Sequence, residues 1–457
     1  MVLGSFRPCR NYAALFSMRK RIPSGCRWLK SATAAKIIAS TMDQIHPTPA
    51  PVLLYDEDAV PVFQPEKVVV LSKITRYEFE RKRYPHLSDR QLAEKLAQKG
   101  SDYYTLRELN AYHKNQADKI VRTLRNKGIE THIVNRYEYG PEVIDWADAI
   151  ISAGGDGTFL LGASKIRNCQ KPLIGINTDP RRSEGYLCLP KAASLNFSES
   201  LDKLMNGQFR WFYRQRIRIQ LSGPSALETP VELHEQELNF PEHRFADWAV
   251  EDAVEFADAS RECSRRDVSV AGSRSSNSRL LPEVALNEVF IGESLSSSTF
   301  LCRVSYYEIS LDDAPSVKQK SSGVTICTGT GSTSWSFNIN KLTEQATASI
   351  LKIVRESSDL PVPTESEFVK SVTKTFNDEL IFDPSDTRLV CTIRDPVSNS
   401  IYGTSNPRGF VNKVVVKSRC FDASLVIDGG PSYKFNDGAE AILTTHPDDA
   451  LRTVQLL

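Results

Sequence analysis

Residues 148–158, Asp148-Ala149-Ile150-Ile151-Ser152-Ala153-Gly154-Gly155-Asp156-Gly157-Thr158, join a short apolar run to a glycine-rich turn. Such a run is typical of a strand that is buried on both faces of a parallel sheet. The apolar segment Phe159–Ile166 follows the turn and predicts a helix. Because open α/β sheets bind ligands at the carboxyl ends of their strands, we expect a ligand site at this turn.

Strand and helix signals alternate on both sides of this stretch. A helix is predicted to start after Ser88, whose hydroxyl can form a capping box with Gln91, and to end at Gly100. A second helix should run to about Gly128, and a short one should lie near Trp146. Further strands are predicted at Lys67–Ser72, Ile129–Val134 and Pro172–Ile176. This alternation predicts a doubly wound α/β layer.

Beyond about residue 210 the predicted elements become short strands with turn residues between them. The interval from about 239 to 279 is rich in Ser, Arg, Asp and Glu without a sustained period, and it predicts a surface insertion. We expect this half of the chain to be mostly β. The predicted strands are Arg216–Leu221, Val284–Ile291, Tyr306–Ser310, Gly323–Cys327, Leu389–Ile393, Val411–Val416 and Ser424–Ile427.

Composition and charge narrow the class of protein. Of the 457 residues, 40% are hydrophobic and 25% charged, and no apolar run reaches the roughly 18 residues of a membrane span, so we expect no membrane insertion. Residues 1–42 hold eight Lys or Arg and no acid, which is typical of a mitochondrial transit peptide. Without them, 49 basic and 56 acidic residues remain, a net charge of −7 that argues against nucleic acid as a partner.

The turn around Asp156 carries the first candidate for chemistry. Its glycines let a phosphate or ribose approach backbone amides without a Cβ in the way. The carboxylate of Asp156 can accept a hydroxyl proton, and general-base catalysis of this kind contributes roughly 10² to 10⁴ in rate. The structural alternative is a plain Asx turn. The complete five-residue string at a strand end favours the functional interpretation.

Two further strings add polar groups. The segment Thr328-Gly329-Thr330-Gly331-Ser332-Thr333-Ser334 concentrates hydroxyls and amides in a way that suits a polyphosphate, although it lacks the Gly-Lys-Ser/Thr of a P-loop. Asn287-Glu288 is a polar pair within an apparent strand, where burial requires a hydrogen-bond partner from either a ligand or neighbouring backbone. Asp428-Gly429-Gly430 is interpreted as a hairpin turn.

Together, and in this order, these strings resemble the NAD kinase family, with wider stretches similar to its animal mitochondrial branch. The resemblance implies a Rossmann-like α/β domain and a C-terminal β-sandwich-type domain, as in the NAD kinase and diacylglycerol kinase-like superfamily. It also implies the boundaries: a leader over 1–42, a linker over 43–66, the α/β domain over 67–205, the β-rich domain over 206–437, and a C-terminal segment over 438–457 that returns to the α/β domain.

The resemblance also implies roles for single residues. Asp156 would be the general base for the 2′-hydroxyl of NAD, and Asn287 and Glu288 would hold the ribose and adenine portions of NAD. The other nucleotide-binding positions would be Gly155, Gly157, Thr158, Tyr186, Thr330, Gly331, Ser332, Thr333 and Ser334. No protein ligand for a metal is identified, and Mg²⁺ would be bound through the phosphates of ATP. The expected protein is a homodimer of the mitochondrial matrix.

Two other functions remain open at this stage. A lipid kinase of the diacylglycerol or sphingosine type would share the turn around Asp156, but it should also show an apolar or basic segment for docking to a membrane. A catalytically inactive NAD-binding regulator would keep the pocket without the reaction. The presence of Asp156 argues against the regulator, since binding alone does not require a base.

Overall fold

The computed structural model describes residues 61–233, 277–293, 304–358, 361–397 and 406–457, which belong to a single compact unit. The predicted leader over 1–42 lies outside the described residues. So do residues 43–60 of the predicted linker over 43–66 and residues 239–276 of the predicted insertion over 239–279.

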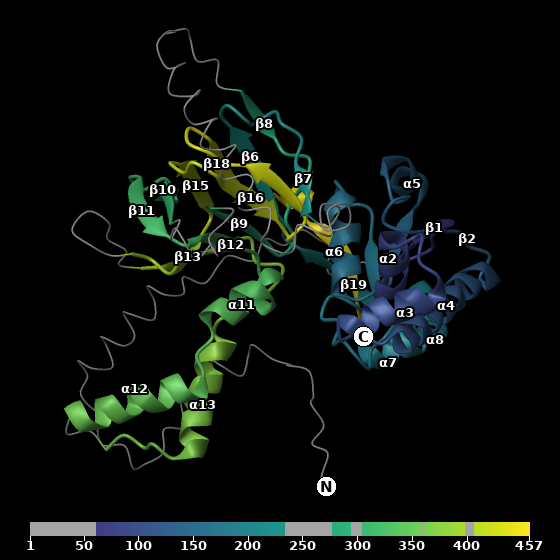
Figure 1. Cartoon of the computed structure of the whole chain (residues 1–457), viewed down its shortest axis with the longest axis horizontal. Helices are drawn as coiled ribbons and strands as arrows, with labels where there is room; N and C mark the ends of the chain where they lie inside the picture. Colours follow the sequence, from purple (N-terminus) through teal and green to yellow (C-terminus); the bar gives the residue numbers. More distant parts are fainter. Residues whose placement is uncertain (1–60, 234–276, 294–303, 359–360, 398–405) are drawn as a thin grey trace. The chain divides into compact units, whose positions relative to one another are not determined.

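The N-terminal half contains a four-stranded parallel sheet (Figure 1). Its strands are β1 (Lys67–Ser72), β2 (Glu130–Val134), β3 (Ala149–Gly154) and β4 (Leu173–Asn177), in the order β2-β1-β3-β4. Every residue of the inner strand β3 and of the edge strand β4 is buried, as expected for strands whose two faces are both covered. The four strands predicted from the sequence are confirmed to within one residue at each start.

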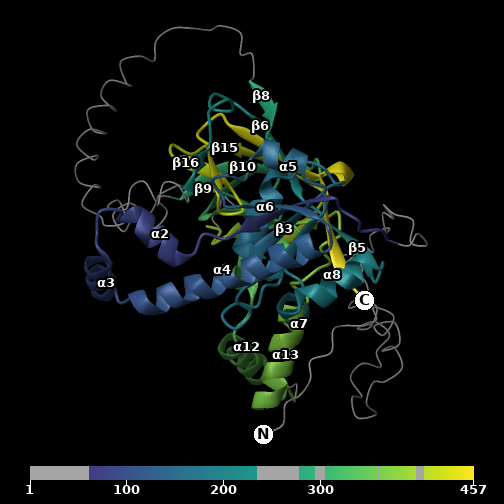
Figure 2. The same cartoon turned by 90° about the vertical axis from the view of Figure 1, so that its right-hand side faces the viewer.

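Helices supply the two apolar layers that enclose this sheet. The predicted capping box is present, since the Ser88 hydroxyl accepts from the Gln91 amide and the Gln91 side chain accepts from Ser88. Gly100 then adopts a positive φ of 70°, the left-handed conformation that ends helices without a Cβ penalty. Figure 2 shows the long helix α4 in this half. The helices are α2 (Arg76–Arg83), α3 (Asp89–Gln98), α4 (Tyr103–Asn126), α5 (Pro141–Trp146), α6 (Asp156–Lys165), α7 (Lys191–Leu195) and α8 (Phe197–Met205).

The C-terminal half is built from two antiparallel sheets that share one apolar core. The six-stranded sheet has the order β11-β10-β15-β18-β6-β8, and the seven-stranded sheet has the order β14-β13-β12-β9-β16-β17-β7. Strands of both sheets contribute alternate side chains to the core, such as Ile219 from β6 and Ile326 from β12. The predicted fold class, an α/β domain followed by a β-sandwich-type domain, is therefore confirmed.

Seven strands of this half were predicted, and their bounds agree within two residues except for the strand predicted at Val284–Ile291, which begins four residues later, at Glu288. The six-stranded sheet comprises β6 (Ile217–Ser222), β8 (Ser278–Leu280), β10 (Ser305–Leu311), β11 (Val317–Ser321), β15 (Lys413–Ser418) and β18 (Glu440–Thr445). The seven-stranded sheet comprises β7 (Val231–Glu232), β9 (Glu288–Glu293), β12 (Gly323–Cys327), β13 (Leu389–Arg394), β14 (Arg408–Val411), β16 (Ala423–Ile427) and β17 (Pro431–Lys434).

Three α-helices in the described part of the C-terminal half were not predicted. They are α11 (Trp335–Asn340), α12 (Glu344–Ser357) and α13 (Ser366–Asp378), and α12 packs against α13 (Figure 1). The Thr343 hydroxyl caps α12 by accepting from the Ala346 amide. The buried contact between the two helices is largely polar, since the Thr373 hydroxyl donates to the Thr347 hydroxyl at 2.9 Å. Both helices carry apolar residues at helical spacing that stay partly exposed, such as Ile350, Val354 and Phe376, and the sequence analysis overlooked this pattern.

The two ends of the β-rich segment connect back to the α/β layer. Strand β5 (Phe209–Arg214) pairs with β19 (Leu451–Leu456) in a separate two-stranded sheet, and Phe209 and Val454 lie in the same core as β1, β3 and β4. Strand β18, by contrast, still belongs to the six-stranded sheet. The return of the chain, expected over 438–457, is therefore made by β19.

Candidate active site

The glycine turn predicted at the end of β3 is a tightly packed junction between β3 and α6. A Cβ on Gly154 would lie 2.7 Å from Cβ of Thr158 and 3.1 Å from Cβ of Lys73, so only glycine fits there. Gly155 is extended and precedes the first residue of α6, which is Asp156. A Cβ on Gly157 would meet nothing within 4 Å, and Thr158 is buried. Within this turn, Gly154 is needed for packing while Gly157 is open.

The carboxylate of Asp156 is half-buried and is held by backbone amides. Its Oδ2 accepts from the Tyr186 amide at 3.1 Å, and its Oδ1 accepts from the Leu187 amide at 2.9 Å. Each oxygen keeps further acceptor capacity, because an ionised carboxylate has about four lone-pair sites. The Tyr186 ring contributes nothing to this contact, and the residue is 71% exposed. Asp156 is therefore fixed in orientation and still available to a ligand hydroxyl.

The turn before Tyr186 is shaped by a buried amide. Asn177, the last residue of β4, donates from Nδ2 to the Ser183 carbonyl at 2.9 Å and accepts from the Asp179 amide at 3.0 Å. Gly185 has a φ of 67° and packs against the Asn177 side chain, where a Cβ would lie 3.2 Å from Cβ of Asn177. The end of β4 thus sets the position of the two amides that hold Asp156.

Asn287 and Glu288 lie at the start of β9 rather than in the middle of a strand. This corrects the predicted strand Val284–Ile291. Asp428, in the turn between β16 and β17, fixes the start of β9. Its carboxylate accepts from the amides of Leu286, Asn287 and Glu288 at 2.7, 2.8 and 2.9 Å. The turn itself confirms the predicted hairpin, and its carboxylate is a functional group that the sequence analysis did not identify.

The side chains of this pair differ in how they are satisfied. Asn287 is buried, and within the described part of the chain its Oδ1 has no hydrogen-bond partner. Glu288 Oε2 accepts from the Ser334 hydroxyl at 3.0 Å. Burial and, to a smaller extent, the nearby carboxylate of Asp428 raise the pKa of Glu288, and the hydrogen bond from Ser334 opposes the increase. The resulting pKa is about 7. An unsatisfied buried acceptor beside a carboxyl group of raised pKa is typical of a binding site.

The hydroxyl-rich segment forms a compact turn that packs on this pair. The Thr328 amide donates to the Asn287 carbonyl at 3.0 Å, and a Cβ on Gly331 would lie 2.9 Å from Cα of Asn287. The chain then forms a single 3₁₀ turn over Gly331–Thr333 before α11 begins. Most hydroxyls of the segment bond to the protein itself, as in the contact from Ser332 to the Gly329 carbonyl at 2.7 Å. Thr330 and Ser332 are buried, Ser334 is half-buried and Thr333 is exposed.

Two cations that the sequence analysis did not single out lie beside these motifs. Arg214, the last residue of β5, donates from Nη1 to Oγ1 of Thr330 at 3.4 Å and also interacts electrostatically with Asp156. Lys73 follows β1 and borders Gly154, and burial lowers its pKa while the charge of Asp179 opposes the decrease. Arg214 thus connects the turn of Asp156 to the turn of Thr330. Neither cation stands in a motif, so no local pattern indicates its role.

A second arginine contacts the helix that begins with Asp156 at its other end. Arg216 in the β5–β6 connection is fully buried, and its Nη1 donates to the carbonyls of Ala163 and Ile166 at 2.9 and 2.6 Å, at the carboxyl end of α6. Burial lowers the pKa of Arg216 to about 10, and the charges of Asp449 and Asp428 oppose the decrease. The carboxyl end of the helix that begins with Asp156 is therefore held by a buried guanidinium.

Comparison with known proteins agrees with this arrangement. A family model described as the ATP-NAD kinase N-terminal domain matches residues 66–209, which include Asp156. "NAD kinase 2, mitochondrial" of Rattus norvegicus is 47% identical over 396 residues, covering 86% of this chain and 88% of the relative. The protein of that name from Homo sapiens is also 47% identical, covering 86% of this chain and 85% of the relative.

Among solved structures, an NAD kinase from Archaeoglobus fulgidus in complex with ATP aligns over 86% of this chain and 93% of that chain. The identity is 15% and the TM-score is 0.44. The identity to the animal proteins is far higher and spans most of both chains. On that evidence the chain belongs to the NAD kinase family.

Proposed function

We propose that this protein transfers the terminal phosphoryl group of ATP to the 2′-hydroxyl of the adenosine ribose of NAD, which gives NADP. The observation that carries the proposal is the carboxylate of Asp156, half-buried at the first turn of α6 and oriented by two backbone amides. A fixed carboxylate with free acceptor sites suits a general base. Its neighbours are the glycine turn and Arg214, which suit a ligand that carries phosphate.

In this proposal Asn287 and Glu288 bind NAD. The free Oδ1 of Asn287 can accept from a ribose hydroxyl or an adenine amino group, and the raised pKa of Glu288 lets its carboxyl group act as donor or acceptor near neutral pH. Gly155, Gly157 and Thr158 would face the phosphates, and Thr330, Gly331, Ser332, Thr333 and Ser334 would border the nucleotide mainly through their backbone. Tyr186 would place its exposed ring beside the dinucleotide.

Mg²⁺ is proposed as the accompanying metal ion. Within the described ranges, no group of three His, Cys, Asp or Glu side chains could hold a metal by itself. Mg²⁺ keeps several waters and is usually bound by substrate phosphates together with one or two carboxylates, and Asp156 and Glu288 supply carboxylates at this site. The residues therefore fit a metal that arrives with ATP. When bound, it would offset negative charge on the donor phosphates.

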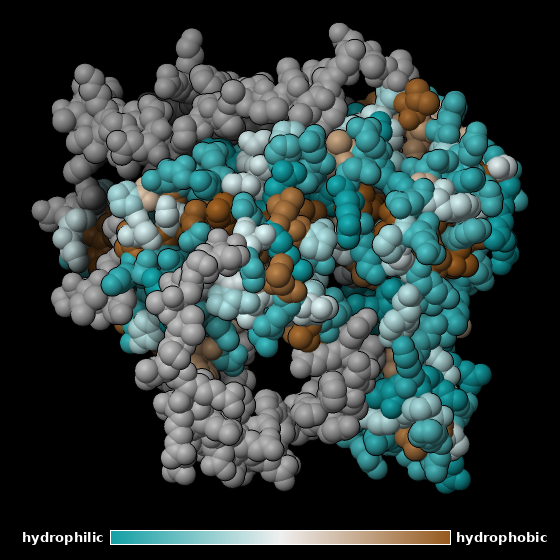
Figure 3. Space-filling model, turned by 90° about the horizontal axis from the view of Figure 1, so that it is seen from above, coloured by the Kyte–Doolittle hydropathy of each residue, from teal (hydrophilic) through white to brown (hydrophobic). Residues whose placement is uncertain are grey.

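A lipid kinase is not favoured. Among the described residues, no helix is both long and apolar enough to cross a membrane. The face in Figure 3 carries small, separate hydrophobic patches within a mostly hydrophilic surface. The family membership established above instead favours a dinucleotide as the acceptor. We also propose, from the resemblance to the mitochondrial relatives, that the protein acts as a homodimer in the mitochondrial matrix.

A product assay tests the proposed reaction. Purified residues 43–457 are incubated with ATP and Mg²⁺ and with NAD, NADH or a diacylglycerol in parallel, and the products are separated by chromatography. We expect NADP from NAD, and an Asp156→Asn variant should lose on the order of 10² or more in kcat because its side chain cannot accept the proton. Phosphorylation of the lipid alone, or full activity of the variant, would refute the proposal.

A further inference from the structure

Arg214 has hydrogen-bond donors that the protein does not use. A guanidinium carries five N–H donors in a fixed plane. In Arg214, one nitrogen reaches Thr330 Oγ1 at 3.4 Å, at the long end of the hydrogen-bond range. Its Nε is buried, and among the described residues it has no hydrogen-bond partner. The carbon of the guanidinium lies 5.3 Å from the centre of the Phe212 ring, so one face of the group is covered.

The charges around Arg214 hold it in place without forming a close ion pair. Asp156 and Asp383 both favour its charged form, while burial has the larger effect and lowers its pKa to about 10. The group therefore remains a cation at neutral pH. The carboxylate of Asp383 is already engaged, since its Oδ1 accepts from the Ser385 amide at 2.7 Å and from the Ser385 hydroxyl at 2.6 Å.

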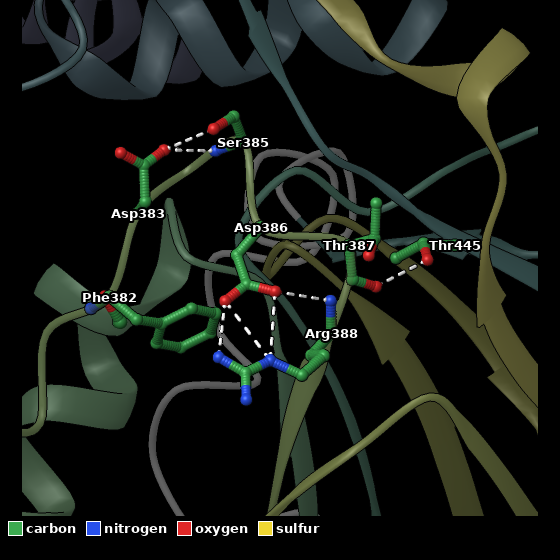
Figure 4. Close-up of polar contacts among 8 residues, drawn as sticks. Phe382, Asp383, Ser385, Asp386, Thr387, Arg388 and Thr445 are labelled. Atoms are coloured by element: carbon green, nitrogen blue, oxygen red, sulfur yellow. Dashed lines mark hydrogen bonds and ion pairs between the residues drawn. The ribbon is translucent and has the colours of Figure 1, made fainter. Parts of the chain in front are cut away.

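The loop that contains Asp383 is itself rigidly anchored (Figure 4). Asp386 and Arg388 form a half-buried ion pair with Nη2 to Oδ2 at 2.8 Å, and the Thr445 hydroxyl donates to the Thr387 carbonyl at 2.6 Å. Next to Arg214, the Gln215 amide donates to the Pro384 carbonyl at 2.8 Å. The position of Arg214 between this loop and Asp156 is therefore a fixed feature of the fold.

The neighbouring Arg216, which has a structural role, provides a comparison for Arg214. Arg216 lies two residues further along and is fully buried, and it donates to the carbonyls of Ala163, Ile166 and Asp449. Its role is to join elements of the fold. Among the described residues, Arg216 also keeps one buried nitrogen, Nη2, without a partner, but its other bonds go to three backbone carbonyls, and Arg214 bonds to none. The free donors of Arg214 therefore suit an anion that the protein alone does not supply.

We propose that Arg214 binds the phosphoryl group while it passes from the donor to the ribose hydroxyl. The inference rests on the proposed function and adds a residue to it. In the reaction, the ribose O2′ forms a bond to the γ-phosphorus as the bond from that phosphorus to the β–γ bridging oxygen breaks. The bond electrons leave with ADP, and the hydroxyl proton passes to Asp156. Arg214 donates hydrogen bonds to the non-bridging oxygens, where its charge stabilises the transition state.

The test compares Arg214→Met and Arg214→Ala with Arg210→Met in the full chain. Arg210 lies on the same strand, is exposed and bonds to Gln455, so it serves as a matched control. We expect both Arg214 variants to lose about 10³-fold in kcat, as reported for arginines that contact a transferred phosphoryl group. The KM for NAD and the melting temperature should remain near the wild-type values, and the control should be unchanged.

Chemical rescue separates contact with phosphate from a structural role. Guanidinium ion added to Arg214→Ala should restore part of kcat with saturation, and it should do nothing for Asp156→Asn. The variant should also lose affinity for ADP with aluminium fluoride, a mimic of the transferred group, while its affinity for ADP is kept. Unchanged kcat, or a loss that follows only the fraction of unfolded protein, would overturn the inference. If the wild type does not phosphorylate NAD at all, the proposed function is refuted, and the inference on Arg214, which rests on it, is refuted as well.

Discussion

Asp428 and Glu288 are joined by two hydrogen bonds, one donated by the backbone amide of each residue. The Glu288 amide donates to Oδ1 of Asp428 at 2.9 Å, and the Asp428 amide donates to the Glu288 carbonyl at 3.0 Å. Asp428 has a φ of 48°, in the left-handed region that Asp and Asn tolerate better than most residues. The hairpin turn between β16 and β17 therefore positions the residues proposed to bind NAD.

Replacing Asp428 by Asn should weaken both the fold and the binding of NAD. The amide oxygen can replace one carboxylate oxygen, but the amide nitrogen would then face a backbone N–H and leave it unsatisfied. We expect a loss of about 2 kcal/mol in the free energy of unfolding and an increased KM for NAD. Urea denaturation and steady-state kinetics measure the two effects. Asp437→Asn, at an exposed ion pair with Arg419, is the control, and an equal loss there would contradict the prediction.

Glu288 should make stability depend on pH. Its pKa is raised from an ordinary value of 4.5 to about 7 in the folded protein. A raised folded pKa means that the contribution of this group is fully present below about pH 4.5 and is lost as the pH rises through about 7. The wild type should therefore lose stability relative to Glu288→Gln as the pH rises from about 4.5 to about 7. A difference in unfolding free energy that stays constant with pH would argue against it.

His113 should have the opposite dependence. It bridges Oγ of Ser72 at 2.9 Å and Oγ1 of Thr178 at 3.0 Å, and burial together with the charge of Lys73 lowers its pKa to about 4. Its contribution is present above the ordinary pKa of 6.5 and is lost as the pH falls through about 4. His113→Gln should remove this acid-sensitive part of the unfolding free energy, as measured by urea titration at several pH values. Exposed His86 provides the control substitution.

Two glycines of the same turn should respond differently to alanine. A Cβ on Gly154 would overlap the Thr158 side chain, so Gly154→Ala should cost about 1–3 kcal/mol of stability. A Cβ on Gly157 has open space, so Gly157→Ala should keep the melting temperature. If phosphate approaches the backbone there, as proposed, the second variant should nevertheless lose activity. Calorimetry and the NADP assay distinguish these effects, and normal activity of Gly157→Ala would exclude close approach of the ligand at that residue.

The sequence alone determined the features that depend on short-range patterns. The buried strands, the Ser88–Gln91 capping box and the glycine turn around Asp156 follow from periodicity, capping chemistry and backbone sterics, which act over a few residues. The same reasoning placed the polar pair Asn287-Glu288 among the candidates. It did not find α12 and α13, although both carry apolar residues at helical spacing, such as Ile350 and Val354, that the structure leaves partly exposed.

Tertiary structure decided which distant groups meet at the site. Asp428 is a hairpin residue by local pattern, yet its carboxylate binds backbone that is 140 to 142 residues away. Arg210, Arg214, Arg216 and Arg218 look alike in sequence. In the structure, Arg210 is exposed, Arg214 lies between Asp156 and Thr330, Arg216 is fully buried among carbonyls and Arg218 forms an ion pair with Asp449. These differences arise from how the sheets pack and close around the glycine turn. Local composition carries no information on that packing, because it depends on the burial and pairing of segments that are far apart in the chain.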